Sequence, residues 1–155
     1  MADPVTTLTS DEVAAIKSSW SAVYDKKKES GVTLFVKLFT ENPSFKSQFG
    51  YMSGVADGDM KTLPALENHG VKVMDRINEW MGNLTNGAEL VKQLKHLGTT
   101  HIALKVTEDN FNAMDSVLMY TLQEQGGSAF TPAAKAAWQK AWGVMKSVIV
   151  GALKG

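Results

Sequence analysis

The chain contains no cysteine among its 155 residues. Without thiols it can form no disulfide framework, zinc ribbon or iron–sulfur cluster, and it has no thiol nucleophile. Histidine is scarce as well, since only His69, His96 and His101 are present. Any chemistry that needs an imidazole must therefore use one of these three side chains.

Net charge and long apolar runs are also missing. Sixteen basic residues balance sixteen acidic ones, so the formal net charge is zero. A neutral chain lacks the electrostatic footprint of a protein that binds nucleic acid or anionic lipid, and we expect neither partner. No run approaches about 18 consecutive apolar residues, so we expect no membrane-spanning helix. The start of the chain, Met1 to Val5, has no basic region followed by an apolar run, which predicts a cytoplasmic protein.

The residues that are present suit one folded domain. Hydrophobic residues make up 44% of the chain, which is close to the globular average and excludes general disorder. A domain of this length buries enough surface for a core and an internal pocket. We expect a short lead over residues 1–8 and a single domain over 9–155.

Apolar residues recur at helical spacing along almost the whole chain, and no useful alternating pattern indicates a strand. The prediction is an all-α fold with about six long helices and one or two short ones. The clearest apolar stripes after residue 64 carry Leu66, His69, Val73, Ile77 and Trp80; then Leu90, Leu94, Leu97 and His101; then Phe111, Met114, Leu118 and Leu122; and last Trp138, Trp142, Met145 and Ile149.

Helix ends can also be predicted from the sequence. Thr9 and Glu12 have the spacing of a capping box, which starts a first helix that runs to about Tyr24. The dense apolar stretch 32–40 predicts a buried helix that Pro43 stops, followed by a short helical turn over 44–49. The charged stretch 25–29 is typical of a turn or a solvated face.

Later helix boundaries follow the same signals. Residues 50–64 are rich in Gly, Asp and Ser and predict a corner, after which Pro64 opens a long helix. Residues 82–87 break that helix. Thr107 and Thr131 are predicted to cap the last two helices, the second of them with a first-turn proline.

His69 and His101 each lie in an apolar stripe, on separate helices. Either one alone is most simply explained as a core histidine with a satisfied hydrogen bond. Together they indicate an apolar slot with two imidazoles, which is too apolar for hydrolysis but suits a flat cofactor with a central metal. A zinc site would need three or four ligands, and His96 and His101 are five residues apart, a spacing that does not place them on the same helix face. The sequence also lacks the Gly-rich motifs of nucleotide sites and the Gly-x-Ser-x-Gly turn of hydrolases.

Several further features stand in a fixed order along the chain. They are Trp20, the segment Leu38-Phe39-x-x-Asn42-Pro43, Phe49, His69-Gly70-Val71-Lys72-Val73, Leu97 with His101, Phe111, and the pair Trp138 and Trp142. Together these features make the sequence resemble the globin family, and invertebrate, mollusc-type members in particular, from Leu8 to the end of the chain.

The resemblance implies a globin fold around haem b (iron protoporphyrin IX). His101 would be the proximal iron ligand, and the Thr100 hydroxyl would accept a hydrogen bond from its Nδ1–H. His69 would be the distal histidine, which hydrogen-bonds a bound gas or binds iron directly. The other implied haem contacts are Phe35, Phe49, Val73, Leu97 and Phe111, with Lys72 and Lys105 as propionate partners.

The implied function is reversible binding of O2 for storage or transport, with other diatomic gases as further ligands and no primary enzymatic activity. Mollusc-type relatives include both monomers and homodimers, so either state is expected. Three alternatives stay open. One is a haem enzyme acting on NO, nitrite or peroxide, the second is a sensor in which His69 binds iron, and the third is a helical interaction domain without cofactor. His96 is expected to be a surface residue.

Overall fold

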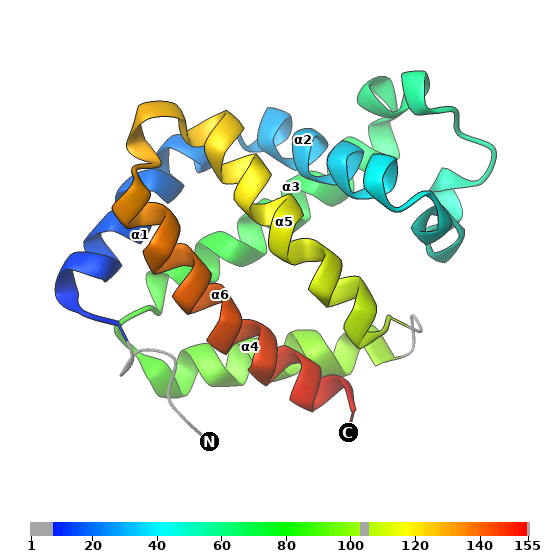
Figure 1. Ribbon diagram of the computed structural model, residues 1–155. Helices are drawn as coiled ribbons and strands as arrows, with labels where there is room; N and C mark the ends of the chain where they lie inside the picture. Colours follow the sequence, from blue (N-terminus) through cyan, green and yellow to red (C-terminus); the bar gives the residue numbers. More distant parts are fainter. Residues whose placement is uncertain (1–7, 103–105, 155) are drawn as a thin grey trace.

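The computed structural model describes residues 8–102 and 106–154, so most of the predicted 1–8 lead, and Lys105 with it, lies outside the described residues. This part of the chain contains six α-helices, four short 3-10 helices and no strand (Figure 1), which confirms the all-α prediction. The α-helices are α1 (Ser10–Tyr24), α2 (Lys27–Glu41), α3 (Pro64–Gly82), α4 (Gly87–Ile102), α5 (Glu108–Gly126) and α6 (Pro132–Leu153). The 3-10 helices are η2 (Pro43–Gln48), η3 (Gly50–Met52), η4 (Asp57–Thr62) and η5 (Gly127–Ala129).

Three of the α-helices, α1, α5 and α6, begin where their capping threonines predict. The Thr9 hydroxyl accepts from the backbone N–H of Glu12 at 3.1 Å, and the Glu12 carboxylate accepts from the Thr9 N–H at 2.8 Å. Thr107 caps α5 through a similar reciprocal pair with Asn110, and the Thr131 hydroxyl caps α6 by accepting from the Ala134 N–H. Each such cap satisfies N–H groups that have no partner inside the helix, and is worth about 1 kcal/mol.

The second helix differs from its sequence-based prediction at its start. It begins at Lys27, inside the charged stretch that is typical of a turn, and the chain leaves helical geometry for only two residues after α1. The reason is tertiary: Ser30 and Gly31 are buried, and the Ser30 hydroxyl donates to the carbonyl of Val23 at 2.8 Å. Packing against α1 therefore extends α2 beyond its apolar stretch.

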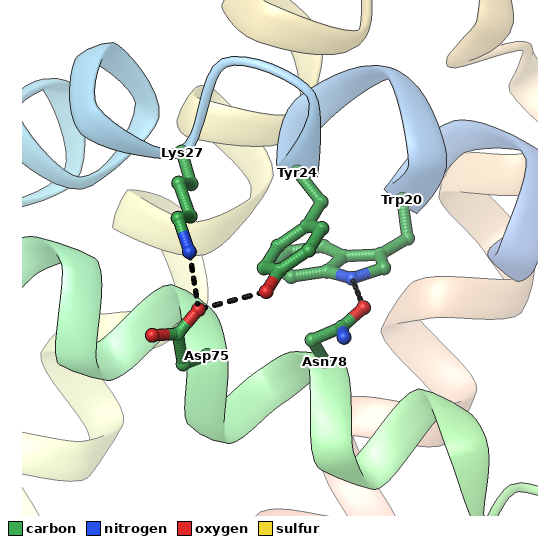
Figure 2. Close-up of polar contacts among 5 residues, drawn as sticks. All are labelled: Trp20, Tyr24, Lys27, Asp75 and Asn78. Carbon is green, nitrogen blue, oxygen red and sulfur yellow. Dashed lines mark hydrogen bonds and ion pairs between the residues drawn. The ribbon is translucent and has the colours of Figure 1, made fainter.

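One polar cluster joins the first three α-helices. Asp75 on α3 accepts hydrogen bonds from the Tyr24 hydroxyl at 2.8 Å and from the Lys27 ammonium at 3.1 Å, while Trp20 donates its indole N–H to Asn78 at 3.1 Å (Figure 2). Because the donors come from α1 and α2 and the acceptors from α3, the cluster fixes how these helices sit along one another.

Two helix pairs cross with their backbones in contact, and glycine makes both crossings possible. A Cβ on Gly31 of α2 would lie 2.5 Å from the backbone of Gly70 on α3, and a Cβ on Gly98 of α4 would lie 2.5 Å from the carbonyl oxygen of Ile149 on α6. Figure 1 shows α2 crossing α3 and α6 crossing α4. Any larger residue would push these helices apart.

The core lies between these crossed helices. Trp138 on α6 is fully buried and donates its indole N–H to Ser19 on α1 at 2.9 Å, while Leu34 and Phe39 of α2 and Leu66 of α3 are fully buried in the same hydrophobic cluster. No helix in the described residues is both long enough and apolar enough to cross a membrane.

Candidate functional site

A largely apolar cavity of about 490 Å³ opens between the helices, and imidazoles from two of them line it. His69 comes from α3 and His101 from α4. The volume lies within the range of small-molecule and cofactor sites. The described residues contain no cluster of three histidine or carboxylate side chains that could hold a metal ion by themselves.

The two glycine crossings position these histidines. His69 precedes Gly70, and Phe35 lies one helical turn after Gly31, so the close approach of α2 to α3 brings the two rings within 4.5 Å between centroids. His101 follows Gly98 by three residues, so the contact of α4 with α6 holds the helix turn that carries it. On both sides of the site, a glycine lies at the contact between two helices and a histidine lies within three residues of a contacting glycine.

The hydrogen bond at Nδ1 determines which nitrogen of His101 is free. Nδ1 lies 2.7 Å from the carbonyl oxygen of Leu97, and a carbonyl can only accept, so Nδ1 carries the hydrogen. A neutral ring of this form leaves the lone pair of Nε2 available to a metal. The Thr100 hydroxyl, expected as the acceptor, lies at 3.4 Å and itself donates to the Leu97 carbonyl at 2.9 Å. The main acceptor is thus the backbone rather than the threonine.

His69 is enclosed by aromatic rings. The centroids of Phe35, Phe49 and Tyr51 lie 4.5, 5.6 and 5.8 Å from its own, and the Tyr51 hydroxyl is 2.7 Å from its Nδ1. Burial lowers the pKa of His69, and it is lowered further by His101 whenever that ring is protonated and by the positive charge of Lys72. The ring is therefore neutral at pH 7, and His101 is close enough to influence it electrostatically.

Most of the other residues that the sequence predicts for the site line the cavity. Those that line the cavity together with the two histidines are Phe35, Phe49, Val73, Leu97, Phe111 and Lys72. Lys72 is otherwise solvent-exposed, as is His96, which does not line the cavity. The predicted contact of Lys105 falls outside the described residues.

Sequence reasoning missed several residues of the site. Tyr51 lies in a stretch that looks like a plain corner, and only its spacing of two residues from Phe49 could have indicated it. Gln48 and Asn110 both line the cavity and join η2 to α5 through paired amide hydrogen bonds, each of 3.0 Å. Trp138 and Trp142 also reach the cavity wall, although their helical spacing indicates only core packing.

The residues present fit a flat, largely apolar cofactor with a central metal and charged edges. Nε2 of His101 would supply one metal-ligand position, and the cavity walls are mainly aliphatic and aromatic. Trp80 also lines the cavity, and its buried Nε1 has no hydrogen-bond partner among the described residues. Lys72 and Arg76 place positive charge at the cavity. Haem has these properties, so the fit is good.

Comparison with known proteins finds globins. The family model described as Globin matches residues 32–149. Globin-1 from Liolophura japonica is 29% identical over 147 residues, which cover 95% of this chain and 97% of that protein.

Solved structures share the fold. Ferric myoglobin of Aplysia limacina superposes with a TM-score of 0.84 at 24% identity, over 96% of this chain and 99% of its own. A hexacoordinated haem protein from an anhydrobiotic tardigrade reaches a TM-score of 0.91 at 19% identity, over 99% and 100%. With a family model matched over most of its length, this chain belongs to the globin family.

Proposed function

We propose that the protein binds O2 reversibly at a haem b in this cavity, for oxygen storage or transport. Membership of the globin family supports a protein that binds haem and a diatomic gas. The observation that carries the proposal is the arrangement of His101, whose Nδ1–H is held by the Leu97 carbonyl so that Nε2 is left free on the wall of an apolar cavity. When bound, ferrous haem supplies the atom that holds the gas and gives O2 more negative charge than CO.

His101 is the residue proposed to bind iron. Its hydrogen bond to Leu97 fixes both the tautomer and the orientation of the ring, as outer partners of metal-binding histidines commonly do. A backbone carbonyl is neutral, whereas the proximal histidine of a dedicated peroxidase typically has a carboxylate partner. The partner found here favours reversible binding over peroxide chemistry.

His69 is proposed to donate its Nε2–H to the gas. Because burial lowers its pKa, the ring is neutral at physiological pH and can act as a donor without carrying a charge into the cavity. A hydrogen bond to a partly charged acceptor is worth about 1.5–3 kcal/mol, which corresponds to roughly ten- to a hundredfold in affinity. O2 gains from this bond and CO gains less, so His69 sets the preference between the two gases.

The other cavity residues have simpler roles. Phe35, Phe49, Val73, Leu97 and Phe111 present apolar surface, which excludes water and so slows oxidation of the metal. Phe35 also limits the space beside His69 and restricts the pocket to small ligands. Lys72 lines the cavity and is proposed, together with Lys105, to pair with the haem propionates.

Cycling the haem-loaded, reduced protein between O2 and argon tests the proposal. Visible spectra that convert fully in both directions over many cycles are expected. Oxidation at the first exposure, or faster consumption of NO, nitrite or peroxide than release of O2, would instead indicate a haem enzyme.

The spectrum of the O2-free ferrous protein tests the role of His69. A single broad visible band is expected, because one imidazole then binds the iron. Split, sharp bands would show that His69 is a second ligand, and would replace the storage or transport proposal with a six-coordinate sensor or enzyme.

A further inference from the structure

Tyr51 places its hydroxyl oxygen 2.7 Å from Nδ1 of His69, with its ring nearly perpendicular to the imidazole at 87°. All three tyrosines of the chain lie in the described part of the structure, and of these only Tyr51 lines the cavity. Tyr51 belongs to η3, which is anchored by the buried Met52, and its ring also packs edge-on against Phe49 at 5.9 Å. The contact is therefore part of the packed wall of the cavity.

The chemistry of the two groups sets the direction of this hydrogen bond. Burial raises the pKa of Tyr51 to about 12, so the hydroxyl keeps its hydrogen at physiological pH. A neutral imidazole has one N–H donor and one bare nitrogen acceptor. A phenol is a much stronger acid than a neutral imidazole N–H, and a bare imidazole nitrogen is a better acceptor than a phenol oxygen. The favoured arrangement has Tyr51 donating to Nδ1, which places the imidazole hydrogen on Nε2.

We propose that Tyr51 is a positioning residue that holds His69 in its Nε2–H form and thereby fixes the hydrogen-bond donor that the cavity offers to a gas. The inference deepens the proposed function and rests on it. It also bears on metal binding, since a protonated Nε2 has no lone pair for iron. For His69 to bind iron, its hydrogen would have to move to Nδ1 and the Tyr51 hydroxyl would have to turn from donor to acceptor.

The two histidines thus hold opposite tautomers because of the partners at Nδ1. The Leu97 carbonyl can only accept, so it leaves the Nε2 of His101 bare. The Tyr51 hydroxyl donates, so it leaves the Nε2 of His69 protonated. One ring is prepared to bind a metal and the other to donate to a ligand.

The test reads the tautomer directly. Long-range proton–nitrogen NMR of the ¹⁵N-labelled full chain, as purified and after loading with ferrous haem and CO, resolves the ring nitrogens of only three histidines. His69→Leu assigns the signal. The native chain is expected to show the Nε2–H form at His69, and Tyr51→Phe, which keeps the ring, is expected to show a mixture of both forms. Tyr120→Phe is the matched control, because it also removes a tyrosine hydroxyl but lies on the exposed face of α5, outside the cavity.

The functional readout is the rate of O2 release. Tyr51→Phe is expected to release O2 about two- to tenfold faster, with a smaller change for CO, as loss of one neutral hydrogen bond allows.

An Nδ1–H form in the native chain, or the same tautomer population in Tyr51→Phe, would overturn the inference. If O2 release in His69→Leu were accelerated while Tyr51→Phe matched the native chain in both readouts, the inference alone would fail. If the chain did not bind haem, the proposed function would fail, and the tautomer of the purified chain would still test the role of Tyr51.

Discussion

His69 and His101 are proposed to have different roles in this cavity, and the difference comes from the group that each ring hydrogen-bonds. His101 hydrogen-bonds a backbone carbonyl of its own helix at 2.7 Å, whereas His69 meets a tyrosine hydroxyl from a different element at the same distance. The carbonyl is four residues away in the chain, so helical geometry alone supplies it. The hydroxyl reaches His69 only because the corner between α2 and α3 folds back onto α3. The geometry behind the proposed proximal role of His101 is therefore local, and the geometry behind the proposed distal role of His69 depends on tertiary structure.

At this scale the first prediction concerns His69. Replacing it in His69→Leu removes the proposed donor while keeping an apolar side chain of similar reach. O2 dissociation, measured by rapid mixing, is expected to accelerate about ten- to a hundredfold. CO dissociation is expected to change less, and oxidation of the iron in air is expected to become faster.

A matched control for this variant is His96→Leu, which changes an exposed histidine outside the cavity. It should leave both rates unaltered. If His69→Leu changed O2 and CO dissociation by the same factor, the effect would be steric rather than a hydrogen bond, and the donor role of His69 would be wrong.

At the scale of whole helices, a backbone contact and a polar cluster determine how α2 and α3 lie against each other at the site. The crossing of α2 over α3 depends on Gly31 and Gly70, and the polar cluster around Asp75 lies farther along the same two helices. The crossing fixes how near the helices come, and the cluster restricts how they slide. Since Phe35 and His69 lie beside the crossing, the geometry of the distal pocket depends on both.

This arrangement makes the stability of the fold depend on the charge of Asp75. Hydrogen bonds from Tyr24 and Lys27 stabilise the carboxylate and hold its pKa below the usual value. Its contribution is therefore complete above the unfolded-state pKa of about 4 and is lost as pH falls through the lower folded value. Asp75→Asn is expected to reduce the free energy of unfolding at pH 7 by up to about 1 kcal/mol, since the pair is partly exposed.

Urea unfolding at pH 7 and at about pH 3 measures this dependence. The difference between the native chain and Asp75→Asn should shrink at the lower pH. Glu79→Gln on the same helix is the control, because its 4.0 Å pair with Arg76 is long and exposed and should contribute little at either pH. An equal loss at both values would mean that the carboxylate charge is not what stabilises the helix contact.

Across the whole molecule, the parts predictable from sequence are those with local causes. The starts of α1, α5 and α6 follow from the hydroxyls of Thr9, Thr107 and Thr131, and α3 starts at Pro64. The early start of α2 could not be predicted, because it depends on burial of Ser30 and Gly31 against other helices. Likewise, the region predicted as a corner contains η3 and η4, whose short turns have no apolar period to reveal them.

The site also has a part that the sequence predicts and a part that depends on tertiary contacts. His69, His101 and the apolar residues around them lie in helical stripes, so the sequence indicates them, and the globin resemblance gives each an implied role. Tyr51, Gln48 and Asn110 reach the cavity through contacts between segments that are distant in the chain. The acceptor for His101 differs from the expected one because Thr100 turns its hydroxyl to the Leu97 carbonyl.

The central claim is that this cavity binds haem through His101, and the most direct measurement is a spectroscopic titration of the purified chain with haem. The account predicts a Soret band that saturates at one haem per chain. It also predicts that His101→Gly loses haem or needs added imidazole to retain it, while His96→Gly on the same helix behaves like the native chain. A native chain that stays colourless with excess haem, or a His101→Gly variant with an unchanged haem spectrum, would contradict it.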